Sequence, residues 1–150
     1  MGLAKTRPDG FANVTEETTQ LSLPSRVESI AEAAAAADAS AKLYGLDEEA
    51  AFGLDMAVRE AVTNAVLHGN KQDESKQVEI TFSKESGELV VTVRDRGEGF
   101  DPAHVADPTV AENLLKTSGR GILFMRNFMD TVEWQRHLEG GTVVRMTKKI

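Results

Sequence analysis

Cysteine is absent from the sequence, which excludes disulfide bonds, thiolate metal sites and a cysteine nucleophile. Positive charge is scarce: 17 lysine and arginine residues face 24 aspartate and glutamate residues, so the formal net charge is −7. Non-specific binding of nucleic acid needs a basic surface, and this balance argues against it. A polyphosphate ligand would need backbone N–H groups or a metal ion to offset the repulsion.

Long apolar runs are also missing. No stretch is long enough to span a bilayer and no signal peptide is recognisable, which favours a cytoplasmic protein without membrane contact. Hydrophobic residues still make up 41% of the 150 residues, enough for the core of one domain. Residues 1–16 show little periodicity and are expected to form a flexible N-terminal tail, followed by a single domain over residues 17–150.

The hydrophobic period changes along the domain from helical to alternating. It predicts a strand, two helices, a hairpin, a loop, a third helix and a second hairpin, over residues 18–23, 25–45, 47–69, 78–93, 97–119, 121–129 and 132–146. Ser25 and Glu28 have the spacing of a capping box, and Asp47 can cap the second helix. Helices followed by antiparallel hairpins indicate an α+β fold: a two-layer sandwich of a mixed, mostly antiparallel sheet with helices on one face.

Three polar residues follow one stripe of the second predicted helix. Glu60, Asn64 and His68 are spaced four residues apart, beside an apolar face. A carboxylate can take a proton, and an amide oxygen can bind a hard cation such as Mg²⁺. The stripe either is solvated or lines a pocket, and His68 is as well explained by a hydrogen bond at the helix end.

A second polar segment follows an apolar strand. Asp95 can accept a hydrogen bond from an exocyclic amine of a ligand, while Gly97 and Gly99 allow close approach of the backbone or a positive φ. The pattern D-x-G-x-G is not the dinucleotide-binding fingerprint, and no βαβ unit surrounds it. Taken alone, it also fits an ordinary turn with two glycines.

A third segment opens the last predicted helix. Gly119, Arg120 and Gly121 precede its first apolar residues. Free N–H groups at a helix N-terminus form an anion site suited to phosphate. The alternative is a glycine-rich helix entry with no ligand.

Together and in this order, the three segments resemble the ATP-binding motifs of the Bergerat (GHKL) fold. Residues 60–69 look like its N box, 95–99 like its first glycine box and 119–121 like its second, while 100–118 take the place of the ATP lid. The resemblance covers about residues 18 to 148. The short domain and the pattern E-x-x-x-N-x-x-x-H-G most resemble the anti-sigma factor serine/threonine kinases.

The resemblance implies a role for each matching residue. Glu60 would be the general base, Asn64 would bind Mg²⁺ on the ATP phosphates, and Asp95 would bind the adenine amino group. Gly97 and Gly99 would shape the floor of the nucleotide site. Gly119, Arg120 and Gly121 would lie against the phosphates.

The implied protein is an ATP-dependent serine/threonine protein kinase. It would phosphorylate an anti-sigma-factor antagonist, sequester a sigma factor and form a homodimer, with ATP and Mg²⁺ as cofactors and no direct contact with nucleic acid. The alternative is a nucleotide-dependent regulatory binding protein of the same fold without phosphotransfer. The ATPase half of a histidine kinase is disfavoured, because no phospho-accepting histidine lies on a predicted dimerising helix.

Overall fold

The computed structural model describes residues 5–6, 12–13, 18–97 and 125–150. Their elements follow the predicted order of strand, two helices and hairpin, then a helical turn at 125–128 and a second hairpin. Two short strands precede them: β1 (Lys5–Thr6) and β2 (Ala12–Asn13) pair antiparallel. The domain boundary expected after residue 16 stays a prediction.

One five-stranded sheet forms the first layer. It contains β3 (Thr19–Pro24), β4 (Gln77–Glu85), β5 (Glu88–Arg94), β6 (Thr131–Arg136) and β7 (Thr142–Lys149). The spatial order is β3-β4-β5-β7-β6, and each pairing of these described strands is antiparallel, although the sequence allowed a mixed sheet. The predicted turn between β4 and β5 is confirmed by the positive φ angles of Ser86 (51°) and Gly87 (77°).

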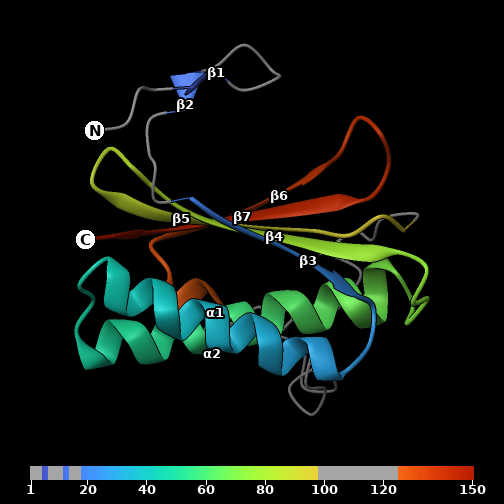
Figure 1. Cartoon of the computed structure of the whole chain (residues 1–150), viewed down its shortest axis with the longest axis horizontal. Helices are drawn as coiled ribbons and strands as arrows, with labels where there is room; N and C mark the ends of the chain where they lie inside the picture. Colours follow the sequence, from blue (N-terminus) through green and yellow to red (C-terminus); the bar gives the residue numbers. More distant parts are fainter. Residues whose placement is uncertain (1–4, 7–11, 14–17, 98–124) are drawn as a thin grey trace.

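Two helices form the second layer, α1 (Glu28–Leu43) and α2 (Glu48–Asn64). Figure 1 shows them side by side against one face of the sheet. Small side chains on α1 permit the close approach, since Ala33, Ala37 and Ala41 are buried one turn apart. The largest side chains without exposure come from α2 and the sheet: Leu54, Val58, Val62, Val78, Ile80, Phe82, Leu89, Val91 and Met146. Each large one contributes roughly 1.5–3 kcal/mol by leaving water.

The helix starts follow the sequence in one case and depart from it in the other. Asp47 caps α2 as predicted, because its Oδ1 accepts a hydrogen bond from Ala50 N at 2.8 Å. The capping box predicted at Ser25 is wrong. Helix α1 begins at Glu28 without a side-chain cap, and the Ser25 hydroxyl donates instead to Lys76 O, directly before β4.

Helix α2 ends in a π-helical segment, η1 (Ala65–Gly69). The predicted end at Gly69 is therefore confirmed, but the change of winding was not predicted. In η1 the Asn70 N–H donates to Ala65 O, five residues back, at 2.8 Å. Such π turns occur often at functional sites. The wider winding turns His68, which is half-buried, away from the position that a continuous α-helix would give it.

Within the described ranges no helix has the length and apolar character needed to cross a membrane.

Candidate nucleotide site

Asp95 lies directly after β5 and is 1% exposed. Its Oδ1 accepts hydrogen bonds from Gly97 N at 3.1 Å and Thr142 N at 3.2 Å, and its own N–H donates to Thr142 O at 3.0 Å. Oδ2 accepts no hydrogen bond from the described residues, so it can accept one from a ligand. Burial raises the pKa of Asp95 above its usual value, although the two amides and nearby Arg94 act in the opposite direction.

Three glycines surround this carboxylate, and each is required by close packing. A Cβ on Gly69 would lie 2.3 Å from the Asp95 carboxylate, and one on Gly141 would lie 2.0 Å from Asp95 O. A Cβ on Gly97 would lie 1.8 Å from Gly69 O. Such distances are far inside van der Waals contact, so only glycine fits. The end of the α2–η1 helix, the turn after β5 and the start of β7 therefore meet at Asp95.

Asn64 lies on α2 and is 2% exposed. Neither its Oδ1 nor its Nδ2 has a hydrogen-bond partner among the described residues. A buried amide without partners costs about 1–3 kcal/mol, which a protein tolerates where a ligand completes the bonds. The Asn64 oxygen is the kind of hard ligand that Mg²⁺ accepts beside nucleotide phosphates, so the residue fits this ion.

Glu60 lies one helical turn before Asn64 and is half-buried. Its Oε2 is buried and has no hydrogen-bond partner among the described residues. Burial raises the pKa of Glu60 above its usual value. A carboxylate whose pKa moves toward neutral is better suited to take up a proton at physiological pH.

A pocket lies between α2, η1 and the sheet, and its empty space of about 220 Å³ includes solvent at its open mouth. Its lining comes from α2, η1, β5, β6 and β7 and comprises Ala61, Asn64, Ala65, Val93, Asp95, Trp134, Thr142 and Val144. Asn64 and Asp95, which are 31 positions apart in the sequence, therefore share one pocket. Glu60 is not among the lining residues. Gly99, Gly119, Arg120, Gly121 and the lid segment 100–118 lie outside the described residues, so their predicted roles stay predictions.

Sequence reasoning missed several residues of this site. Thr142, the first residue of β7, donates a hydrogen bond to Asp95, and Gly141 before it packs against the Asp95 backbone. Asn70 accepts a hydrogen bond from Arg96 N at 2.7 Å. The alternation of Trp134 with Val132 is typical of a core residue; Trp134 does pack against the core, but it also lines the pocket. The pair Gly140-Gly141 indicates a tight turn inside the second predicted hairpin, yet nothing in the sequence connects this turn with Asp95.

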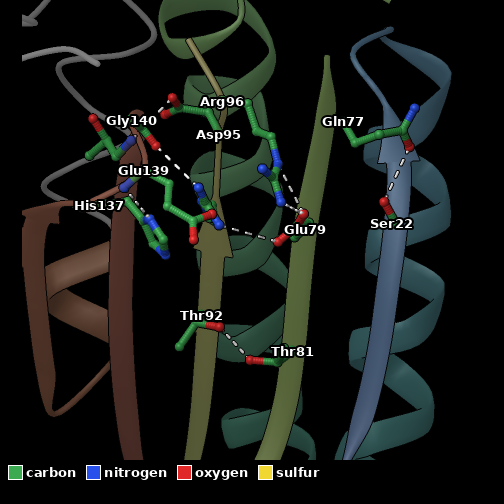
Figure 2. A network of polar contacts seen from close by, with 12 residues as sticks. Ser22, Gln77, Glu79, Thr81, Thr92, Asp95, Arg96, His137, Glu139 and Gly140 are labelled. Carbon is green, nitrogen blue, oxygen red and sulfur yellow. Dashed lines mark hydrogen bonds and ion pairs between the residues drawn. The ribbon is translucent and has the colours of Figure 1, made fainter. Parts of the chain in front are cut away.

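The face of the sheet away from the helices anchors the same turn. Figure 2 shows Arg96 reaching Glu79 on β4, where its Nε donates to Oε1 at 3.1 Å. The neighbouring Arg94 lies 3.9 Å from the same carboxylate and donates to Gly140 O at 3.3 Å. Asp95 and Arg96 thus point to opposite sides of the sheet, as consecutive residues of an extended chain do.

Three features together define a site for a small polar ligand: the buried Asp95 acceptor at the end of β5, the Asn64 amide without a partner among the described residues, and the glycines packed closely around Asp95. The model of the histidine kinase-like ATPase domain family matches residues 23–148, and the chain belongs to this family. The resemblance that the three motifs indicated is thereby confirmed, and a domain of this family implies nucleotide binding.

Three relatives with the same name are similar to this chain. The chain is 35% identical over 134 residues to the anti-sigma F factor of Heyndrickxia coagulans, covering 87% of this chain and 90% of that protein. It is 31% identical over 150 residues to the anti-sigma F factor of Clostridium perfringens strain 13, covering 99% and 92%. For the anti-sigma F factor of Bacillus subtilis the identity is 36% over 95 residues, covering 62% and 65%.

Proposed function

We propose that this chain is an ATP-dependent serine/threonine protein kinase that phosphorylates an anti-sigma-factor antagonist and sequesters a sigma factor. One observation carries the proposal: Glu60 and Asn64 lie one turn apart on α2, each with buried polar atoms that have no partner in the described residues, and Asn64 shares a pocket with Asp95. A candidate ligand for a metal and an acceptor for a base thus share the pocket, and a candidate proton acceptor lies one helical turn from the metal ligand.

Each residue has a distinct part in the proposal. Oδ2 of Asp95 accepts a hydrogen bond from the adenine amino group, which selects adenine over guanine because guanine has a carbonyl oxygen at that position. Asn64 holds Mg²⁺ through its amide oxygen. When bound, the ion neutralises the charge of the phosphates, which suits a chain with a net charge of −7. Gly97, Gly99, Gly119, Arg120 and Gly121 are assigned to the nucleotide by resemblance.

The transfer step moves the γ-phosphoryl group of ATP to a hydroxyl oxygen of the antagonist. The bond from the γ-phosphorus to the oxygen bridging it to the β-phosphate breaks, a new phosphorus–oxygen bond forms at the hydroxyl, and ADP leaves. Glu60 takes the hydroxyl proton, and its raised pKa makes it a stronger base than an exposed glutamate.

The partners follow from the relatives' name. All three relatives described above are named anti-sigma F factors, and two of them are matched over about nine-tenths of their length. Their name supports a sigma factor as partner. The proposal also includes a cytoplasmic location and a homodimer. Sedimentation at equilibrium tests the homodimer directly. A nucleotide-dependent binding protein without phosphotransfer is the second candidate, since the same pocket can sense a nucleotide without Glu60 acting as a base.

A labelled-phosphate assay separates the two candidates. The purified chain is incubated with ATP carrying a label in the γ-phosphate and with a purified antagonist, alongside an antagonist whose acceptor serine is alanine. Label on the first antagonist and none on the second supports the kinase. A folded chain that binds ATP, captures its partner and transfers no label contradicts the kinase and favours the binding protein.

A further inference from the structure

Asn70 follows the π segment η1 directly and is 1% exposed. Its side chain uses both ends of the amide. Nδ2 donates to Ser25 Oγ at 2.7 Å and to Gln77 O at 3.1 Å, while Oδ1 accepts from Arg96 N at 2.7 Å. A buried amide with this many bonds is costly to replace, because each lost bond leaves a buried group without a partner.

The two ends of the amide hold different parts of the molecule. The donor end connects the entrance of α1 and the first residue of β4, both at the side of the sheet near β3. The acceptor end holds the backbone N–H of Arg96, the residue next to Asp95. Asn70 therefore joins the end of the α2–η1 helix to the turn that carries the adenine acceptor.

The chain around Asn70 is itself shaped for this contact. Lys71 and Gln72 follow Asn70 with φ angles of 53° and 60°, which are unfavourable for residues other than glycine. The Gln72 N–H closes the turn by donating to Val66 O at 2.7 Å. A strained exit persists where surrounding bonds fix it, and the hydrogen bonds of Asn70 and Gln72 supply them.

We propose that Asn70 is a positioning residue: through the Arg96 amide it fixes the turn that directs Asp95 into the pocket, and so sets the preference for adenine. The inference rests on the proposed nucleotide site. Asp95 Oδ1 is fixed by Gly97 N and Thr142 N, but Gly97 itself lies beyond Arg96 in the same turn. Freeing the Arg96 amide loosens the turn from the helix side, and a shift of about 1 Å weakens a directional bond to the base.

The test compares Asn70→Ala with Ser25→Ala. Ser25→Ala removes one partner of the donor end and leaves the bonds to Gln77 O and from Arg96 N in place. Dissociation constants for ATP and GTP are measured by calorimetry, thermal unfolding gives stability, and amide hydrogen exchange of Arg96 and Gly97 is followed by NMR without nucleotide.

Asn70→Ala is expected to weaken ATP binding about tenfold, to reduce the ratio of GTP to ATP dissociation constants and to accelerate exchange at Arg96. Ser25→Ala is expected to lower the unfolding temperature with the ratio and the Arg96 exchange unchanged. A folded Asn70→Ala chain with the wild-type ratio overturns the proposal. So does the same loss of ratio in Ser25→Ala, because that result indicates general destabilisation.

Two further outcomes are decided in advance. If Asn70→Ala does not fold, Asn70→Asp takes its place, since it keeps an acceptor for Arg96 N and loses the donors; a retained ratio supports the proposal and a lost ratio overturns it. If the wild type binds no ATP, the proposed function fails. The exchange measurement then still tests Asn70, and unchanged exchange at Arg96 in Asn70→Ala overturns its positioning role.

Discussion

Gly69 at the end of the π segment and Asp95 after β5 are packed so closely that a Cβ on the glycine would lie 2.3 Å from both Cγ and Oδ2 of the aspartate. The carboxylate is thus pressed against helix backbone on one side and bonded to Thr142 N on the other. This contact explains why a glycine ends the N box, because any side chain there would occupy the place of the Asp95 carboxylate.

Gly69→Ala is expected to displace the Asp95 carboxylate and weaken ATP binding at least about tenfold, with a loss of about 1–3 kcal/mol in stability from overpacking. Gly45→Ala is the matched control. Gly45 has a φ of 71° and open space around its Cβ position, so alanine there costs about 1 kcal/mol of backbone strain without touching the site. Calorimetry with ATP should separate the two variants. Equal ATP affinities would show that the contact does not position Asp95.

Asp95→Asn is expected to weaken ATP binding, since an amide can present a donor where the carboxylate offers only acceptors. Its effect on stability has the opposite sign. Burial raises the folded-state pKa of Asp95 above the usual 3.8, so the cost of the buried charge is absent at low pH and complete above the folded-state pKa. Asparagine carries no charge, and its oxygen can still accept from Gly97 and Thr142.

The unfolding temperature of Asp95→Asn relative to the wild type should therefore rise with pH above the usual pKa of 3.8, as the pH passes through the raised pKa of Asp95. Paired melting curves across this range measure the difference, and other carboxylates cancel because both proteins contain them. A difference that falls with pH would mean that the ionised form is stabilised in the fold.

Much of this structure was predictable because it depends on neighbours in the sequence. The alternation of Val78, Ile80 and Phe82 indicates one buried face of a strand, and Asp47 needs only Ala50 to cap a helix. The site depends on residues far apart in the sequence. Thr142 bonds Asp95 over 47 positions, so local patterns carry no trace of the contact.

The residues at the end of the N box show the same limit. Asn70 is hydrogen-bonded to Ser25, which is 45 positions away in the sequence, and to Arg96, which is 26 positions away. The residues next to Asn70 in the sequence look like those of any helix end. The π winding of η1 was not predictable either, because over five residues an α-helix and a π-helix bury nearly the same apolar side chains. Asn64 and Asp95 were found by resemblance to a family, which supplies the long-range pairing that periodicity lacks.

Glu60→Gln should keep ATP affinity and lose at least about tenfold in the rate of phosphate transfer. The wild-type rate should rise with pH through the raised pKa of Glu60, since only the ionised carboxylate accepts a proton, and the variant should lack this limb. Glu49→Gln, in the exposed first turn of the same helix, is the control and should leave both rate and profile unchanged. A Glu60→Gln chain with the wild-type rate would exclude the base.

Trp134 should report nucleotide binding through its fluorescence. It is the single tryptophan of the chain, it lines the pocket, and the guanidinium of Arg126 lies 5.6 Å from its ring centroid. A bound base changes the polarity around the indole, so titration with ATP should change the emission and saturate at the affinity found by calorimetry. Emission that stays constant while calorimetry records binding would place the nucleotide elsewhere. Trp134→Phe, which keeps an aromatic ring, should abolish the signal and retain binding.

Asn64→Ala should separate ligand binding from folding. Because the Asn64 amide has no partner among the described residues, its removal is expected to leave the nucleotide-free protein equally stable or more stable by up to about 1 kcal/mol. The gain in ATP affinity that Mg²⁺ provides should be lost, as shown by titrations with and without the ion. Thr63→Ala, which removes a hydroxyl bonded to Arg59 O on the same helix, should keep the Mg²⁺ effect. A marked loss of stability in Asn64→Ala would mean that the amide serves the fold rather than the metal.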